Sequence, residues 1–114
     1  MTQSAQDVLE LSIQQVSEGF RQKRWSPVEI TEASLARIHG TEPDLHAWVI
    51  VDAERALATA RQAERELIAG EDRGPLHGIP IGIKDIYDVA GLPTRCGSEA
   101  RADAPAATTS APTV

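Results

Sequence analysis

The stretch that decides the fold is GPLHGIPIGIKDIYDVAGLPTRCGS, residues 74–98. Its first half alternates isoleucine with small or polar residues, and in an extended chain alternate residues lie on opposite faces. One face would carry Ile79, Ile81 and Ile83, and the other would carry Pro80, Gly82 and Lys84. This pattern predicts a strand over residues 79–85, followed by turns at residues 88–93 and 97–98. Pro80 keeps the start of that strand out of the middle of a hydrogen-bonded ladder.

Upstream of this stretch the sequence predicts helices. The apolar residues Leu9, Ile13, Val16 and Phe20 recur at steps of four, three and four, which predicts a helix over about residues 5–24. A second helix is predicted to begin after Ser26, which has Pro27 at the first helical position and Glu29 in place for a capping box. Gly40 is expected to end that helix.

A third helix is predicted over residues 53–69, where alanine and leucine form an apolar stripe. Asp52 is its expected N-cap and Gly70 its expected C-terminal stop. Between the second and third helices, LHAWVIVD is short, β-branched and aromatic, which predicts a strand at residues 48–51. Because alanine is small, the third helix is expected to pack closely.

Composition limits the class of protein. The 114 residues fit one small domain, and 41% are hydrophobic but only 4% aromatic, which predicts a thin aliphatic core. The net charge is −6 with no run of Lys or Arg, which argues against nucleic-acid binding. The sequence shows neither a signal peptide nor a membrane span, and its single cysteine, Cys96, suggests no disulfide or metal site. We therefore expect a cytoplasmic protein that needs no cofactor.

Lys84 is the residue in this stretch with the clearest chemical potential. Gly82 and Pro80 share its predicted face and leave room beside the amine for a substrate or another backbone. Burial of that face would favour a neutral amine, which can accept a proton from a hydroxyl as histidine does in serine hydrolysis. The alternative is structural: a lysine at a strand end prevents sheets from pairing edge to edge.

Residues 74–98 resemble the lysine-bearing segment of the amidase signature family. The upstream segments SPVEITEASLARI, AWVIVD and ERALATARQAERE resemble the family's N-terminal part, so the resemblance covers nearly the whole chain. It implies metal-free hydrolysis of carboxylic amide C–N bonds through an acyl-enzyme and a Ser-cisSer-Lys triad. In amidotransferase A subunits, it implies release of ammonia from glutamine. Lys84 matches the lysine that acts as the base.

The resemblance also implies two serines, a relay serine in a cis peptide and a nucleophile, in a later Gly/Ser-rich segment. Nothing like that segment occurs before Val114, and Ser98 and Ser110 lie in contexts that do not match it. A base without a nucleophile or an oxyanion hole loses most of the rate enhancement. We therefore expect these 114 residues to be inactive alone.

The expected fold class is α/β: N-terminal helices plus the first strands of the mixed-sheet amidase signature fold, incomplete. Residues 1–101 are expected to form the N-terminal part of that domain. Residues 102–114, ADAPAATTSAPTV, are expected to be a loose tail that leads to the start of a truncated helix at Ser110 and Pro112.

Other interpretations stay open or carry less weight. The chain could be a truncated or split subunit that needs a partner, or a small binding module. A phosphate-binding loop is disfavoured because Ile83 and Asp85 flank the lysine. Cys96 and His77 could form a thiol and its base, but no spacing rule links them. Asp85 is expected to hold the turn after the strand through backbone hydrogen bonds.

The sequence does not choose the substrate or the assembly. A small amide is the implied substrate, whether indoleacetamide-type, aryl, aliphatic or glutamine. A homodimer and an amidotransferase-type partner are both compatible with the resemblance.

Overall fold

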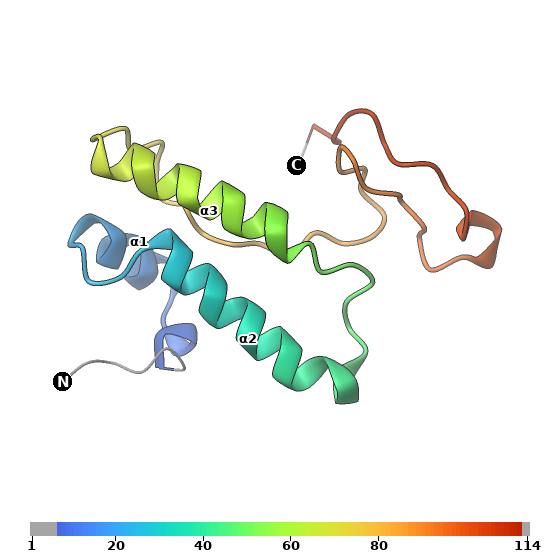
Figure 1. The fold of residues 1–114 in the computed structure, drawn as a ribbon, viewed down its shortest axis with the longest axis horizontal. Coiled ribbons are helices and arrows are strands. Elements are labelled where there is room, and N and C mark those ends of the chain that lie inside the picture. The colour runs from blue at the N-terminus through green and yellow to red at the C-terminus, as the bar shows by residue number, and fades with distance from the viewer. Residues whose placement is uncertain (1–6, 113–114) are drawn as a thin grey trace. The chain divides into compact units, whose positions relative to one another are not determined.

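The computed structural model describes residues 7–112, and its regular elements are helical (Figure 1). In order along the chain they are η1 (Asp7–Glu10), α1 (Ile13–Arg21), α2 (Pro27–Leu45), α3 (Ala53–Ile68) and η2 (Glu99–Arg101). The chain divides into two compact units, residues 1–80 and residues 81–114. We call their described parts the helical unit (residues 7–80) and the Lys84 unit (residues 81–112).

The N-terminal apolar pattern does not form one helix. The helix expected over residues 5–24 is wrong as a single element, because η1 ends before Ser12 and α1 begins after it; residues 5 and 6 lie outside the described residues. The Ser12 hydroxyl accepts from the Gln15 N–H at 3.2 Å, and the Gln15 side chain accepts from the Ser12 N–H at 2.8 Å. This capping box starts a new helix, although the regular spacing of apolar residues continues across the break between η1 and α1.

Helix α2 begins as the sequence predicts. The Ser26 hydroxyl accepts from the Glu29 N–H at 3.2 Å, and the Glu29 carboxylate accepts from the Ser26 N–H at 2.7 Å. Pro27 occupies the first turn, where its missing N–H leaves no helical hydrogen bond unmade. The predicted capping box is confirmed.

The expected end of α2 at Gly40 is wrong, because the helix continues to Leu45. Glycine in a helix interior costs about 1 kcal/mol relative to alanine, which weakens a helix without ending it. The chain leaves the helix at His46, whose φ of 48° is left-handed. The Glu42 carboxylate accepts from the two backbone N–H groups that follow His46, those of residues 47 and 48, at 3.1 and 2.9 Å.

Helix α3 matches its prediction at both ends. The Asp52 carboxylate accepts from the Arg55 N–H at 3.2 Å, and Gly70 takes the left-handed φ of 85° just after the C-cap. Helices α2 and α3 lie side by side (Figure 1). Ala60 and Ala63 are only 5% and 4% exposed, so α3 packs closely there as expected, whereas Ile68 at its end is 73% exposed.

The core of the helical unit is small. Val8, Val16, Phe20 and Ile30 are buried, and Trp25 is among the partly buried residues packed against them. The Trp25 indole N–H donates to the Val16 carbonyl at 3.0 Å. Its ring fills the space beside Gly19: a Cβ built on that glycine would lie 2.1 Å from Trp25 Cε2. A glycine within α1 therefore makes room for the largest side chain next to this core.

The two expected strands, residues 48–51 and 79–85, are absent from the structure over residues 7–112. A strand needs a neighbouring strand to pair its N–H and C=O groups, and none of the described segments pairs with either one as a strand. Trp48, Val49 and Val51 are exposed, as are Ile81 and Ile83. Of the expected α/β class, only the helical part is therefore visible.

The Lys84 unit is built from turns and two isolated bridges, Ala90 with Ala107 and Pro93 with Ala106. Residues 106–111 form backbone hydrogen bonds with residues 88–92. The domain boundary expected after Arg101 stays a prediction.

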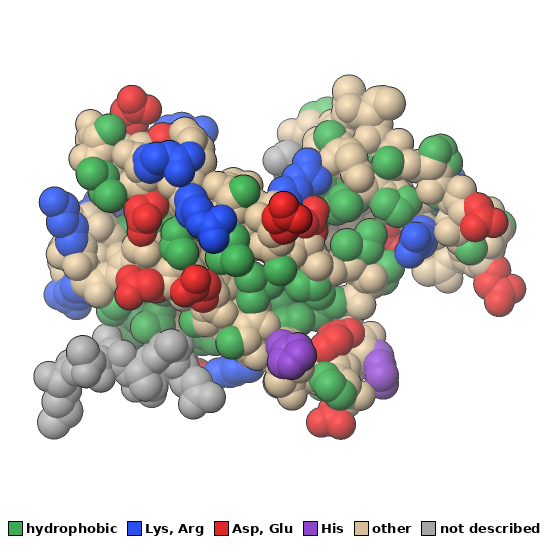
Figure 2. All heavy atoms as spheres, in the orientation of Figure 1, with side chains coloured by type: hydrophobic (Ala, Val, Ile, Leu, Met, Phe, Trp, Pro, Cys, Tyr) green, Lys and Arg blue, Asp and Glu red, His purple; other side chains and the backbone are tan. Residues whose placement is uncertain are grey.

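On the face drawn in Figure 2, acidic and basic side chains are mixed over the helices, so the helices present no patch of a single charge sign there. None of the helices in the described part is both long and apolar enough to cross a membrane.

Candidate functional site

Lys84 stands at the first position of a turn. The Tyr87 N–H donates to the Lys84 carbonyl at 3.1 Å, which closes the turn over residues 84–87. The side chain of Lys84 is exposed and makes no hydrogen bond or ion pair with a described residue. The amine is therefore free to meet a group from outside residues 7–112.

Asp85 ties this turn to a later segment of the same unit. Its Oδ1 accepts from the Arg95 N–H at 3.1 Å, and its backbone carbonyl accepts from the Cys96 N–H at 3.0 Å. Asp85 does accept backbone hydrogen bonds as predicted, but they come from residues 95 and 96 rather than from the turn that follows it. Cys96 has a left-handed φ of 55° and is exposed rather than buried in a core.

Asp88 makes a second attachment. The Thr94 hydroxyl donates to Asp88 Oδ1 at 2.5 Å, and Arg101 Nε donates to the Thr94 carbonyl at 2.8 Å. Thr94 is 6% exposed, the most buried side chain of the Lys84 unit that the structure describes. Asp88 thus holds Thr94 from a position that follows the turn at residues 84–87, whereas Asp85 bonds residues 95 and 96 from within that turn.

The two serines considered as substitutes for a nucleophile have other surroundings. Ser110 accepts from the Ala90 N–H at 3.0 Å, in the segment that pairs with residues 88–92. Ser98 precedes η2 and makes no side-chain capping bond. Neither is hydrogen-bonded to Lys84.

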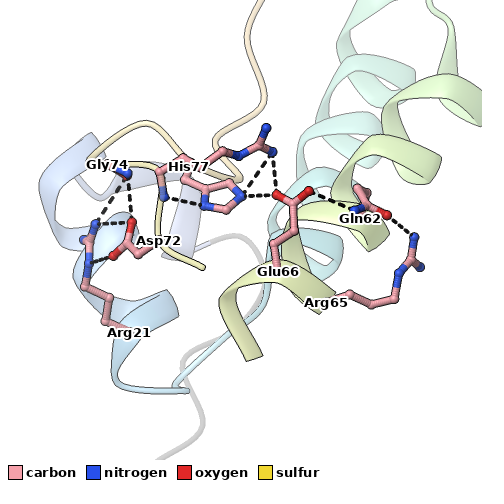
Figure 3. Close-up of polar contacts among 8 residues, drawn as sticks. Arg21, Gln62, Arg65, Glu66, Asp72, Gly74 and His77 are labelled. Atoms are coloured by element: carbon pink, nitrogen blue, oxygen red, sulfur yellow. Dashed lines mark hydrogen bonds and ion pairs between the residues drawn. The ribbon is translucent and has the colours of Figure 1, made fainter. Parts of the chain in front are cut away.

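A polar cluster in the helical unit surrounds His77 (Figure 3). Nδ1 of His77 accepts from the Arg73 N–H at 3.1 Å, so in the neutral ring Nε2 carries the hydrogen and donates to Glu66 Oε2 at 2.8 Å. The Arg73 guanidinium also pairs with that carboxylate oxygen. Both ring nitrogens are therefore engaged inside the helical unit, which removes support for His77 as the base of a Cys96 thiol.

Asp72 makes the matching attachment to α1 (Figure 3). Arg21 Nε donates to Asp72 Oδ2 at 2.7 Å, and the Gly74 N–H donates to Oδ1 at 2.9 Å. The bond from Arg21, reinforced by that from Gly74, lowers the pKa of Asp72. The pKa of Glu66 is lowered chiefly by a hydrogen bond from Gln62, with smaller contributions from His77 and Arg73.

These contacts fasten loop 71–78 to α1 and α3, and sequence reasoning missed them. Arg21 and Asp72 are 51 residues apart, and Glu66 and His77 are 11 apart across a loop. No helical or strand period links such pairs. Only the burial of His77, with its side chain 3% exposed, marks the cluster, and burial is a property of the folded chain.

The geometry around Lys84 can be set beside known proteins. The family model for amidase matches residues 29–113, which include Lys84 and most of both units. This chain belongs to the amidase family. It is 48% identical over 88 residues to the A subunit of the glutamyl-tRNA(Gln) amidotransferase from Acaryochloris marina, a match that covers 77% of the chain and 18% of the relative. The corresponding protein of Geobacter metallireducens is 40% identical over 93 residues, 82% of the chain and 19% of the relative.

Two solved structures share the fold of this amidase-family chain with a TM-score of 0.84 and 30% identity. They belong to a protein complex described as vestigial and as revealing the evolutionary origins of an s-triazine catabolic enzyme, and one has an inhibitor bound. The match covers 89% of this chain and 22% of the solved chain. The chain thus spans about a fifth of the length of the relatives it matches.

Proposed function

We propose that this chain contributes the general base, Lys84, to an amidase that hydrolyses carboxylic amide C–N bonds. The observation that carries the proposal is the Ile-Lys-Asp motif at residues 83–85, inside the stretch that matches the amidase family. The turn geometry supports it, because the Lys84 amine is unpaired among the described residues and can meet a partner hydroxyl.

The proposed chemistry passes one proton along a chain of three groups. A neutral Lys84 amine takes a proton from a relay serine in a cis peptide, and that serine takes one from the serine that attacks the amide carbonyl. The C–N bond breaks, the amine leaves with a proton returned along the same path, and water then hydrolyses the acyl-enzyme. An exposed lysine is ordinarily protonated, so this chemistry requires that other parts of the domain bury Lys84.

In this proposal the 114 residues are inactive alone, because the serines and the oxyanion hole come from a segment that this sequence does not contain. The substrate is a small amide, and glutamine has particular support because the curated relatives are amidotransferase subunits. The same likeness favours an assembly with amidotransferase-type partners in the cytoplasm over a homodimer.

The experiment uses a chimera in which this chain replaces the matching fifth of the Acaryochloris marina relative, assembled with the other subunits of that enzyme. The readout is ammonia released from glutamine. We expect turnover by the chimera and none by the isolated chain on a panel of simple amides. A folded chimera without turnover would contradict the proposal and favour a non-catalytic split subunit, whereas turnover by the isolated chain would show that it has a nucleophile of its own.

A binding module makes a different prediction for the isolated chain. It would unfold in one cooperative thermal transition, whereas strand-forming segments that lack their sheet are expected to give a broad one.

A further inference from the structure

The backbone on the two sides of Lys84 is held very differently. On the N-terminal side, residues 81–83 make no hydrogen bond with any part of the chain that the structure describes. On the C-terminal side, the carbonyls of Lys84 and Asp85 both accept backbone N–H groups. The direction in which the Lys84 side chain leaves the backbone is therefore set from its C-terminal side.

Asp85 makes the more informative of these attachments. Its side chain and its carbonyl accept from two consecutive N–H groups, those of Arg95 at 3.1 Å and Cys96 at 3.0 Å. Two bonds to adjacent residues restrict rotation as well as distance, so they orient the turn at residues 84–87.

The second oxygen of Asp85 gives an independent reason to look beyond stability. Asp85 Oδ2 is buried and has no hydrogen-bond partner among the described residues. An unpartnered buried oxygen is destabilising, because its lost hydration is not replaced. Oδ2 therefore does not stabilise the Lys84 unit, and what Asp85 holds in place it holds through Oδ1 and its backbone carbonyl.

We propose that Asp85 is a positioning residue that fixes the direction of the Lys84 amine. This inference rests on the proposed function, in which Lys84 is the base. Asp85 acts through the acceptor that its side chain offers to the Arg95 N–H, and its negative charge is not required. Misplacement of a reacting group by about 1 Å can cost roughly 100-fold in rate, so loss of this acceptor should lower turnover strongly.

The test compares Asp85→Ala, Asp85→Asn and Asp88→Ala in the chimera with the Acaryochloris marina relative. Asparagine keeps a carbonyl acceptor and removes the charge. Asp88 is the matched control, because it is a carboxylate that holds the adjacent residue, Thr94, from outside the turn at residues 84–87. We expect Asp85→Ala to lower kcat by about 10- to 100-fold with KM little changed, and both other variants to stay within several-fold of the parent.

Three results would overturn the inference: unchanged kcat in Asp85→Ala, an equal loss in Asp88→Ala, or an Asp85→Asn variant as slow as Asp85→Ala. Amide hydrogen exchange of Arg95 in the isolated chain reads the attachment without catalysis, and Asp85→Ala should accelerate it. Unchanged exchange would show that the attachment does not exist. An inactive parent chimera, or full turnover by Lys84→Ala, would instead overturn the proposed function and with it the positioning role given to Asp85.

Discussion

The helical unit and the Lys84 unit satisfy their backbone hydrogen bonds in different ways. In α1, α2 and α3 the backbone bonds run within each helix. At the start of each helix the side chain of the N-cap residue accepts from the backbone N–H three residues later. In the Lys84 unit, bonds that close turns between residues three apart stand beside four backbone bonds that join residues 11 to 23 positions apart, and residues 81–83 form none with the described chain. The backbone bonds of the helices are thus local, although distant side chains attach loop 71–78 to them. The residue proposed for catalysis instead follows a segment that has no backbone partner among the described residues.

This difference explains where the proposed chemistry sits. An α-helix pairs the backbone groups of its interior within itself, so only its first four N–H groups and last four C=O groups need partners from elsewhere. The segment before Lys84 has unmade bonds and exposed isoleucines, which a sheet of the complete domain could cover. The Lys84 unit is therefore expected to gain order from the rest of an amidase, and the helical unit to need less from it.

The largest effect on the stability of the helical unit, and so on its difference from the Lys84 unit, is expected from a substitution at Gly19. A Cβ there would lie within 2.3 Å of three atoms of the Trp25 ring, so Gly19→Ala should displace the indole and break its bond to the Val16 carbonyl. We expect the free energy of unfolding of the helical unit to fall by about 1–3 kcal/mol, measured by urea denaturation followed by the helical circular dichroism signal.

Gly40 provides the control for this substitution. It lies inside α2 with nothing within 4 Å of a built Cβ, so Gly40→Ala should stabilise the chain by about 0.5–1 kcal/mol. Equal effects of the two alanines would contradict the packing role of Gly19.

A smaller effect is expected at the start of α1. Ser12→Ala removes the hydroxyl that accepts from the Gln15 N–H and should cost about 1 kcal/mol. Helix content should fall with it, as measured by circular dichroism. Ser34, whose hydroxyl donates within α2 to the Ile30 carbonyl, is the matched control, since Ser34→Ala removes no cap. A Ser12→Ala variant as stable as the parent would mean that η1 and α1 are held apart by packing alone.

The smallest effect concerns acid, through the attachments of loop 71–78. The pKa of Asp72 is lowered by Arg21 and that of Glu66 mainly by Gln62. Both carboxyls are ionised in the folded and unfolded chains at neutral pH, and the stabilisation is fully present there. Below about pH 4 the unfolded chain takes up protons first, so stability falls with pH.

The check is to measure the midpoint of urea denaturation at several pH values between 6 and 3, for the parent and for the double variant that carries Asp72→Asn and Glu66→Gln. The parent should lose more stability over this range than the double variant. An equal loss in both would assign the acid sensitivity to other carboxyls.

The sequence alone predicted the features that depend on neighbouring residues. The start of α2 at Ser26 and both ends of α3 follow from capping residues a few positions away. The break at Ser12 was missed because the apolar spacing from Leu9 to Phe20 runs across it, although the capping box was present in the sequence. The end of α2 was predicted wrongly at Gly40, because a glycine permits a helix to end but does not require it to.

What the sequence could not predict depends on distant residues. The alternation at residues 79–85 is typical of a strand, but a strand forms only when it pairs with another strand, and residues 7–112 provide none for this segment. The pairs between Arg21 and Asp72 and between Glu66 and His77 have no spacing rule. The alternating pattern drew attention to Lys84, but its proposed role as the base comes from the resemblance to a family.

The measurement that tests the central claim most directly is single-turnover release of ammonia from glutamine by the chimera carrying Lys84→Ala. A general base contributes roughly 10²- to 10⁴-fold, so we expect a loss of at least about 100-fold against the parent. Lys23→Ala, which removes an exposed lysine of the helical unit, is the control and should keep the parent rate. A Lys84→Ala chimera as fast as the Lys23→Ala chimera would contradict the assignment of Lys84 as the base.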